Sequence, residues 1–176
     1  MRASYWRITP EELENLRSNP EAVDRFFGSD IDKDDTERGR AFYVGLLESG
    51  RYLGIDQAWH GIHFLLTGDA SLDIEVPPLS NVVVGGESTG WAAGVGDVRA
   101  LTPQEVREVS EALREISRQN LLQSCDIAAF SANEIYPFRN NWDSVDIEWL
   151  LDAYDEIVPF FCAAADARDS MLLMIN

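Results

Sequence analysis

The alternation of hydrophobic and polar residues along the chain predicts short helices interrupted by a few strands. Residues 4–8 are rich in β-favouring side chains, and the continuous apolar run 171–175 is typical of a strand buried on both faces. The valines at 82–84 and residues 98–101 indicate two further strands. We therefore expect a small mixed β-sheet built from segments near residues 4–8, 82–85, 98–101 and 171–175.

Helix start signals divide the remaining chain. Thr9 and Thr102 each precede a proline and stand three residues before a glutamate, the pattern of a capping box with proline in the first turn. Asp56 is expected to cap a helix over 56–66, which is apolar nearly all round and so belongs in the core. The other expected helices run from Asn19 to Gly28, over 42–53, over 121–124, around Ala128, and from Asp143 or Ser144 through Phe161 with a kink at Pro159, while 29–40 and 85–96 are expected to be loops.

These elements predict a single α+β domain over residues 1–176, with the sheet packed by several helices. The strands are too few and too irregularly spaced for a doubly wound sheet. Large apolar residues on the inward faces of the expected elements should form the core, namely Trp59, Phe64, Leu65, Val83, Val109, Leu113, Leu150 and Leu172.

Composition narrows the class of protein. The chain has 176 residues, 31 acids against 14 bases and a formal charge of −17, while a hydrophobic share of 45% excludes a disordered chain. Phosphate recognition depends on lysine and arginine, so neither nucleic acid nor an anionic membrane is expected as a partner. No apolar run reaches the roughly 18 residues of a membrane helix, and the N-terminus has no signal-like segment.

The cysteine content and the choice of basic residues indicate the cellular compartment and the kind of organism. Two cysteines do not make a disulfide framework in a chain of this size, which suits a reducing cytoplasm. Lys33 is the one lysine among the 14 basic residues and alanine is common, a bias that GC-rich coding produces. We expect a cytoplasmic bacterial protein.

The glycine-rich segment matches two catalytic patterns without their context. Gly86-Glu87-Ser88-Thr89-Gly90 has the spacing of a nucleophile elbow, but no helix is expected directly after it and both histidines precede the serine. Gly94-Val95-Gly96 is not followed by a lysine, and no helix is expected to open there, so neither a phosphate loop nor a dinucleotide site is indicated. We expect this segment to form flexible turns, and we do not expect it to hold the catalytic serine of a hydrolase.

Asp56, His60 and His63 stand at helical spacings of four and three, which would let them share one face toward a divalent metal. A further strong ligand from elsewhere, such as Glu87 or Asp97, would be required. Because Asp56 is expected to cap the helix and the histidines adjoin Trp59 and Phe64, we instead expect structural histidines, at least one of them buried, and no bound metal or cofactor.

Four acids recur at three- and four-residue spacing on the expected long helix, with no base among them: Glu148, Asp152, Asp155 and Glu156. Like charges at these spacings oppose a helix slightly, and a purely structural face usually intersperses bases. The acids could form a docking surface for a basic protein partner, although a net-acidic protein must also expose acids without such a purpose.

One segment resembles a known family. The run Asp56-Gln57-Ala58-Trp59-His60-Gly61-Ile62-His63-Phe64-Leu65-Leu66-Thr67-Gly68 is similar to the signature of the YfbM-like bacterial proteins, the domain of unknown function 1877. The resemblance extends to residues 5–13, 82–87, 101–106, 135–137 and the closing apolar strand, so it spans nearly the whole chain. It implies an intracellular α+β domain and brings no established activity or catalytic residues.

Two functional hypotheses follow. The first is a non-enzymatic protein-binding module, of inhibitor or immunity type, that engages a basic partner through Glu148, Asp152, Asp155 and Glu156. The second is a small-ligand binder or enzyme with a pocket between helix 56–66 and loop 85–96, lined by Trp59, His60, His63 and Glu87, with a histidine as acid or base. The sequence assigns neither a catalytic residue nor an oligomeric state.

Overall fold

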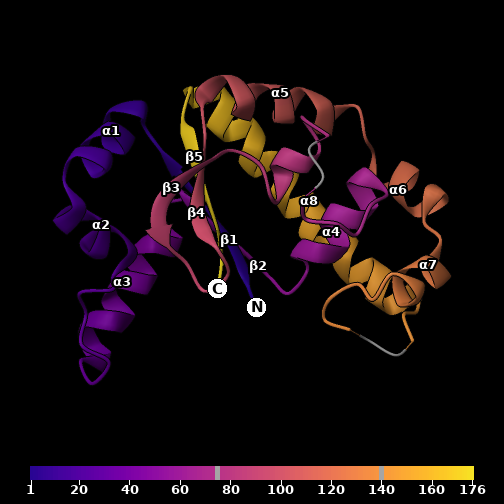
Figure 1. Ribbon diagram of the computed structural model, residues 1–176, viewed down its shortest axis with the longest axis horizontal. Coiled ribbons are helices and arrows are strands. Elements are labelled where there is room, and N and C mark those ends of the chain that lie inside the picture. The colour runs from indigo at the N-terminus through magenta and orange to yellow at the C-terminus, as the bar shows by residue number, and fades with distance from the viewer. Residues whose placement is uncertain (74–75, 139–140) are drawn as a thin grey trace.

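A five-stranded sheet forms the centre of the computed structural model, which describes residues 1–73, 76–138 and 141–176 (Figure 1). The strand order is β2-β1-β5-β4-β3, and every neighbouring pair is antiparallel. The α+β class is confirmed, while the sheet is antiparallel rather than mixed. In chain order the elements are β1 (Ala3–Ile8), α1 (Pro10–Ser18), α2 (Pro20–Phe27), α3 (Thr36–Glu48), β2 (Tyr52–Asp56), α4 (Trp59–Thr67), a 3-10 turn (Ser80–Val82), β3 (Glu87–Ala92), β4 (Asp97–Leu101), α5 (Pro103–Arg114), α6 (Arg118–Ser124), α7 (Ile127–Ala132), α8 (Ser144–Ala167) and β5 (Ser170–Ile175).

Both faces of the sheet are buried. On one face, Tyr5 of β1 and Leu173 of β5 pack into the main core with α4, α5 and α8. On the other, Trp6 and Leu172 pack with α1, whose Leu13 and Leu16 are buried. This explains the uninterrupted apolar run at the C-terminal end of the sequence, because successive strand residues face opposite sides.

Local capping chemistry forms the helices as expected. Thr9 and Thr102 both make complete capping boxes, with Glu12 and Glu105 returning a carboxylate to the cap backbone. Asp143 caps α8 in the same way, and α8 continues through Pro159 to Ala167. Of the eight expected core residues, six are buried: five in the main core and Leu172 in the cluster on the other face of the sheet. Phe64 and Leu65 are partly buried against the main core.

Three element predictions are wrong. Val82 and Val83 are buried, but neither lies in a strand: Val82 is the last residue of a 3-10 turn, and Val83 directly follows it. The segment 87–92, expected to be a loop, forms edge strand β3. Helix α3 begins at Thr36 inside the expected 29–40 loop and ends at Glu48, so the chain already runs as strand β2 where a helix to Leu53 was expected.

The helices divide between the two faces (Figure 1). Helices α1, α2 and α3 lie on one side of the sheet, and α3 projects away from it, whereas α5 and α8 cover the other side, with α4, α6 and α7 beyond. The two chain ends lie together, joined by backbone hydrogen bonds between Arg2 and Asn176. Among the described helices, none combines the length and apolar character of a membrane span.

Candidate functional site

The two histidines of α4 are removed from solvent almost completely. His60 is 9% exposed and His63 is fully buried. The Nδ1 atom of His60 accepts a hydrogen bond from the Tyr136 N–H (2.9 Å), so the ring is protonated at Nε2, which donates to the Ala70 carbonyl oxygen (2.9 Å). Trp59 stacks on both His60 and Tyr136. The expectation that at least one histidine is buried is confirmed, and these hydrogen bonds tie three chain segments together.

His63 is held by the same segment that follows α4. Its Nε2 lies 3.0 Å from the Ser71 carbonyl oxygen, while Nδ1 has no hydrogen-bond partner among the described residues. Burial disfavours the imidazolium and lowers the pKa of His63, and the neighbouring His60 acts in the same direction. The ring is therefore neutral near pH 7 and serves as a packed hydrogen-bond donor.

Asp56 does not cap α4, contrary to the expectation from the sequence. It ends β2 with a left-handed backbone (φ 46°), its carboxylate pairs with Arg2 (3.0 Å), and Ala58 occupies the cap position of the helix. In the described chain, His60 and His63 do not join a third acidic, histidine or cysteine side chain in a group suited to a metal ion. The geometry gives these histidines structural partners instead.

Glu87 lies apart from the histidines. It stands on edge strand β3, and its carboxylate pairs with Arg17 of α1 (3.0 Å) with 77% of its side chain exposed. Helix α1 packs on the sheet face opposite to α4. The structure thus brings Trp59, His60 and His63 together and leaves Glu87 on the other side of the sheet.

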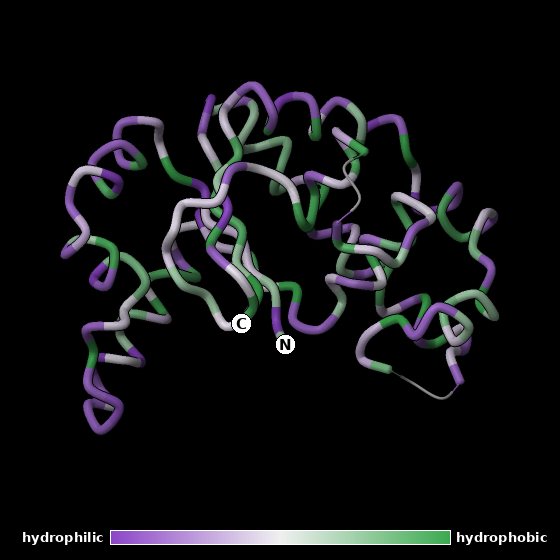
Figure 2. The backbone as a smooth tube through the Cα atoms, viewed as in Figure 1, coloured by the Kyte–Doolittle hydropathy of each residue, from purple (hydrophilic) through white to green (hydrophobic). Residues whose placement is uncertain are grey.

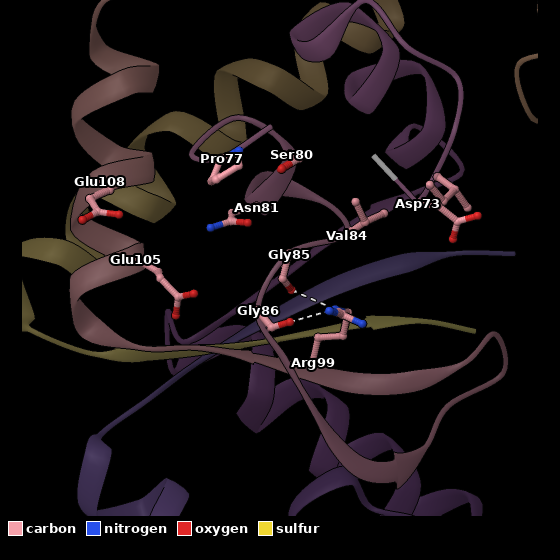
Figure 3. A pocket seen from close by; sticks show the side chains of 11 residues that line it. Asp73, Pro77, Ser80, Asn81, Val84, Gly85, Gly86, Arg99, Glu105 and Glu108 are labelled. Carbon is pink, nitrogen blue, oxygen red and sulfur yellow. Dashed lines mark hydrogen bonds between the residues drawn. The ribbon is translucent and has the colours of Figure 1, made fainter. Parts of the chain in front are cut away.

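The glycine-rich segment does border a cavity, formed with other residues (Figure 3). This cavity of about 470 Å³ lies between the turn 77–86 and the start of α5. The Arg99 guanidinium is fixed at Gly85 and Gly86, donating to both carbonyl oxygens (3.1 and 2.5 Å). Glu105 and Glu108 from α5 also line it, and both carboxylates already accept hydrogen bonds within the helix. Arg99, Glu105 and Glu108 therefore each have a partner within the protein, and Asp73 adds a third carboxylate to the lining.

The acidic face of α8 contains a base that the sequence pattern did not reveal. Arg118, the first residue of α6, donates to the carboxylates of Glu148, Asp152 (3.0 Å) and Asp155 (2.6 Å). The premise that these acids are unpaired is wrong. The hydrogen bonds raise the pKa of Arg118, that to Glu148 most strongly. One guanidinium offsets one of three carboxylates, so this cluster keeps a net charge of −2.

Two apolar side chains flank this cluster. Leu122 of α6 is 47% exposed and Val145 of α8 is 73% exposed, while Glu156, the fourth predicted acid, lies exposed on the same helix. We call the surface formed by Arg118, Leu122, Val145, Glu148, Asp152, Asp155 and Glu156 the α6–α8 face. No local signal could have found Arg118, because it lies 30 residues or more from its carboxylate partners in the sequence.

Comparisons with known proteins agree on the fold and supply no activity. A family model described as a domain of unknown function (DUF1877) matches residues 1–174. The crystal structure of a protein of unknown function, YfbM from Escherichia coli, superposes with a TM-score of 0.70 at 19% sequence identity, covering 100% of both chains. No curated protein matches the chain.

Proposed function

This chain belongs to the DUF1877 family, and from that premise we propose that it is a non-enzymatic protein-binding module whose α6–α8 face receives a basic partner. The observation that carries the proposal is the convergence of three carboxylates from one helix on a single guanidinium. The carboxylates are held in position before any partner arrives, and they keep an excess of two negative charges.

The composition of the α6–α8 face suits a protein partner. Exposed Val145 and Leu122 offer apolar contact beside the charged cluster. Arginine is enriched at protein interfaces, and its planar donors match carboxylates in fixed positions. A partner arginine could bind the outer carboxylate oxygens next to Arg118, with complementary charge accelerating encounter. An inhibitor or immunity-type protein directed at a basic target would work in this way.

The test is a quantitative pull-down from cell extract with matched charge variants. The double variant Asp152→Lys/Glu156→Lys reverses the charge of two acids on this face. It leaves the ion pairs of Arg118 with Glu148 and Asp155 in place, so the internal cluster is disturbed least. Glu14→Lys/Asp24→Lys makes the same charge change on exposed positions of α1 and α2, across the sheet. We expect basic proteins that bind the wild type and the control variant to be lost from the α6–α8 variant.

Equal retention by all three proteins would refute the proposed surface, as would equal loss from both variants, since net charge alone would then explain binding. Before the comparison, circular dichroism and thermal unfolding should be used to establish that each variant is folded. The salt dependence of the captured interaction provides a further check, because contacts between exposed charges weaken as salt rises.

A second candidate, binding of a small cation, is favoured by the cavity at Gly85 and Gly86. Among the residues that the structure describes, three carboxylates line it against one arginine, namely those of Asp73, Glu105 and Glu108. Spermidine is a suitable probe, measured by calorimetric titration. Tighter binding to wild type than to Glu108→Gln, with Glu14→Gln as the control, would support this candidate, and identical weak binding to all three would exclude it.

A further inference from the structure

Helix α3 leaves several large apolar side chains about half exposed. Along its 13 residues no side chain is fully buried, and the least exposed positions are Gly39, Phe42 and Leu46. Isolated helices of this length are marginal in water and depend on packing for their stability. Here the packing comes from one narrow stripe, because Phe42 and Leu46 face α2 and the sheet and contribute to the second core cluster or the cavities beside it.

A second stripe on α3 faces away from the sheet. Val44 and Leu47 are 41% and 52% exposed, and Arg40 lies one turn before Val44. Tyr43, which is 53% exposed, lies at the border of this stripe, because its ring packs edge-on against Tyr52 of β2 (ring centroids 6.4 Å apart). The positions 40, 44 and 47 follow the spacing i, i+4, i+7 of a helix face that can pack against another helix. Figure 2 shows that the later part of α3 is largely hydrophobic, whereas the loop before the helix is hydrophilic.

We propose that this outer stripe is the interface of a homodimer, in which α3 packs antiparallel against α3 of a second copy about a two-fold axis at Val44. In that arrangement a residue that precedes Val44 in one helix lies across from the residue that follows Val44 by the same number of positions in the other helix. Arg40 therefore faces Glu48 of the second copy, and the symmetry repeats this pair. Leu47 packs against Val44 and the aliphatic part of Arg40 of the other helix.

The charge distribution favours a second copy over an unrelated basic or acidic protein. Helix α3 contains two arginines (38 and 40) and two glutamates (37 and 48), so the segment is neutral in a chain of charge −17. Two copies repel each other least where each presents a neutral surface. Within that surface, the order Arg40, Val44, Glu48 is complementary to its own reverse, which is what an isologous interface requires.

The helix is also accessible for this contact. It projects from the sheet at the edge of the molecule in Figure 1, away from the α6–α8 face. Its two glycines have open space around them, with no atom within 4 Å of an added Cβ at Gly39 or Gly45, so the helix surface is unobstructed there. The dimer would leave the α6–α8 face exposed, and the proposal does not depend on that face having a partner.

The test is a charge swap followed by sedimentation velocity at protein concentrations from about 1 to 100 μM in 150 mM salt, a range that spans the affinities of weak to moderate dimers. Arg40→Glu places a carboxylate opposite Glu48 twice in each dimer, and we expect the dimer to weaken about tenfold or more. Arg40→Glu/Glu48→Arg restores both pairs and should return the dissociation constant to within a few-fold of wild type. Arg25→Glu, an exposed position on α2, is the control for net charge.

A wild-type protein that remains monomeric across this range overturns the proposal, and so does a double variant no better than Arg40→Glu or a control that weakens the dimer equally. The geometry is tested separately by cross-linking. In a background with both native cysteines replaced by serine, Val44→Cys should form a covalent dimer on oxidation. Val145→Cys, which is more exposed but lies on α8, should not. A covalent dimer from Val145→Cys alone would place the interface elsewhere.

Discussion

Gly61 provides the sharpest test of how α4 packs on α8. It lies inside α4 and is buried. A Cβ added at this position would stand 2.6 Å from both terminal methyl carbons of Leu150, far closer than carbon atoms approach. Leu150 is itself completely buried in the main core, so moving its side chain aside would disturb its other packing contacts. We therefore infer that glycine is needed here to let the two helices approach.

Two effects of Gly61→Ala oppose each other. In a helix interior, alanine is favoured over glycine by roughly 0.8–1.0 kcal/mol. Overpacking a well-filled core costs about 1–3 kcal/mol. Gly39 of α3 is the matched position, because it is also helical but an added Cβ meets nothing within 4 Å. The helix preference is common to both sites, so Gly61→Ala should be less stable than Gly39→Ala by about 1–3 kcal/mol.

Urea unfolding followed by circular dichroism measures this difference, with an unchanged slope confirming that the folded and unfolded states remain comparable. In a double-mutant cycle, Leu150→Ala should cost less in the Gly61→Ala background than in wild type, because the smaller side chain makes room for the new methyl group. If Gly61→Ala and Gly39→Ala stabilised the protein equally, or the cycle were additive, the close approach of α4 and α8 would be refuted.

Three further predictions concern single side chains. Because the pKa of folded His63 is lowered, the unfolded chain binds more protons below about pH 6.5; the stability of wild type should therefore fall below that pH, and His63→Gln should fall less steeply in urea titrations at several pH values. Tyr154→Phe removes the hydroxyl that donates to the Leu113 and Ile116 carbonyl oxygens and should cost about 1–3 kcal/mol in the free energy of unfolding. Thr102→Ala breaks a capping box and should lower thermal stability by about 1 kcal/mol, whereas Asn19→Ala, whose side chain makes no capping hydrogen bond, should change it little.

Local signals predicted local structure well. The capping boxes at Thr9 and Thr102 depend on four adjacent residues and form as expected. The valines at 82–84 show the limit of such reasoning, because an apolar run reports burial and says little about backbone conformation. Strand β3 was missed for the opposite reason: it is an edge strand with no buried residue, so its sequence carries no hydrophobic alternation.

The candidate sites depended on long-range contacts and were harder to predict. Burial of His60 and His63 followed from the apolar surroundings of α4, but their partners Tyr136, Ala70 and Ser71 lie outside that helix. Helical spacing correctly placed Glu148, Asp152 and Asp155 on one face. It could not show that Arg118 from α6 lies among them, because a tertiary contact between charges leaves no periodic trace in the sequence.

The net charge of −17 acts in opposite senses on the two proposed surfaces. A basic partner is attracted by the whole protein as well as by the α6–α8 face, so raising the salt concentration should weaken that complex. Two copies of this chain repel each other except near neutral α3, so moderate salt should first strengthen self-association, and only the Arg40–Glu48 pairs should lose some attraction. Because α3 presents apolar side chains whose burial is insensitive to screening, the dimer should persist at salt concentrations that dissociate the complex with a basic partner. The two interactions are therefore separable in the same preparation by salt alone.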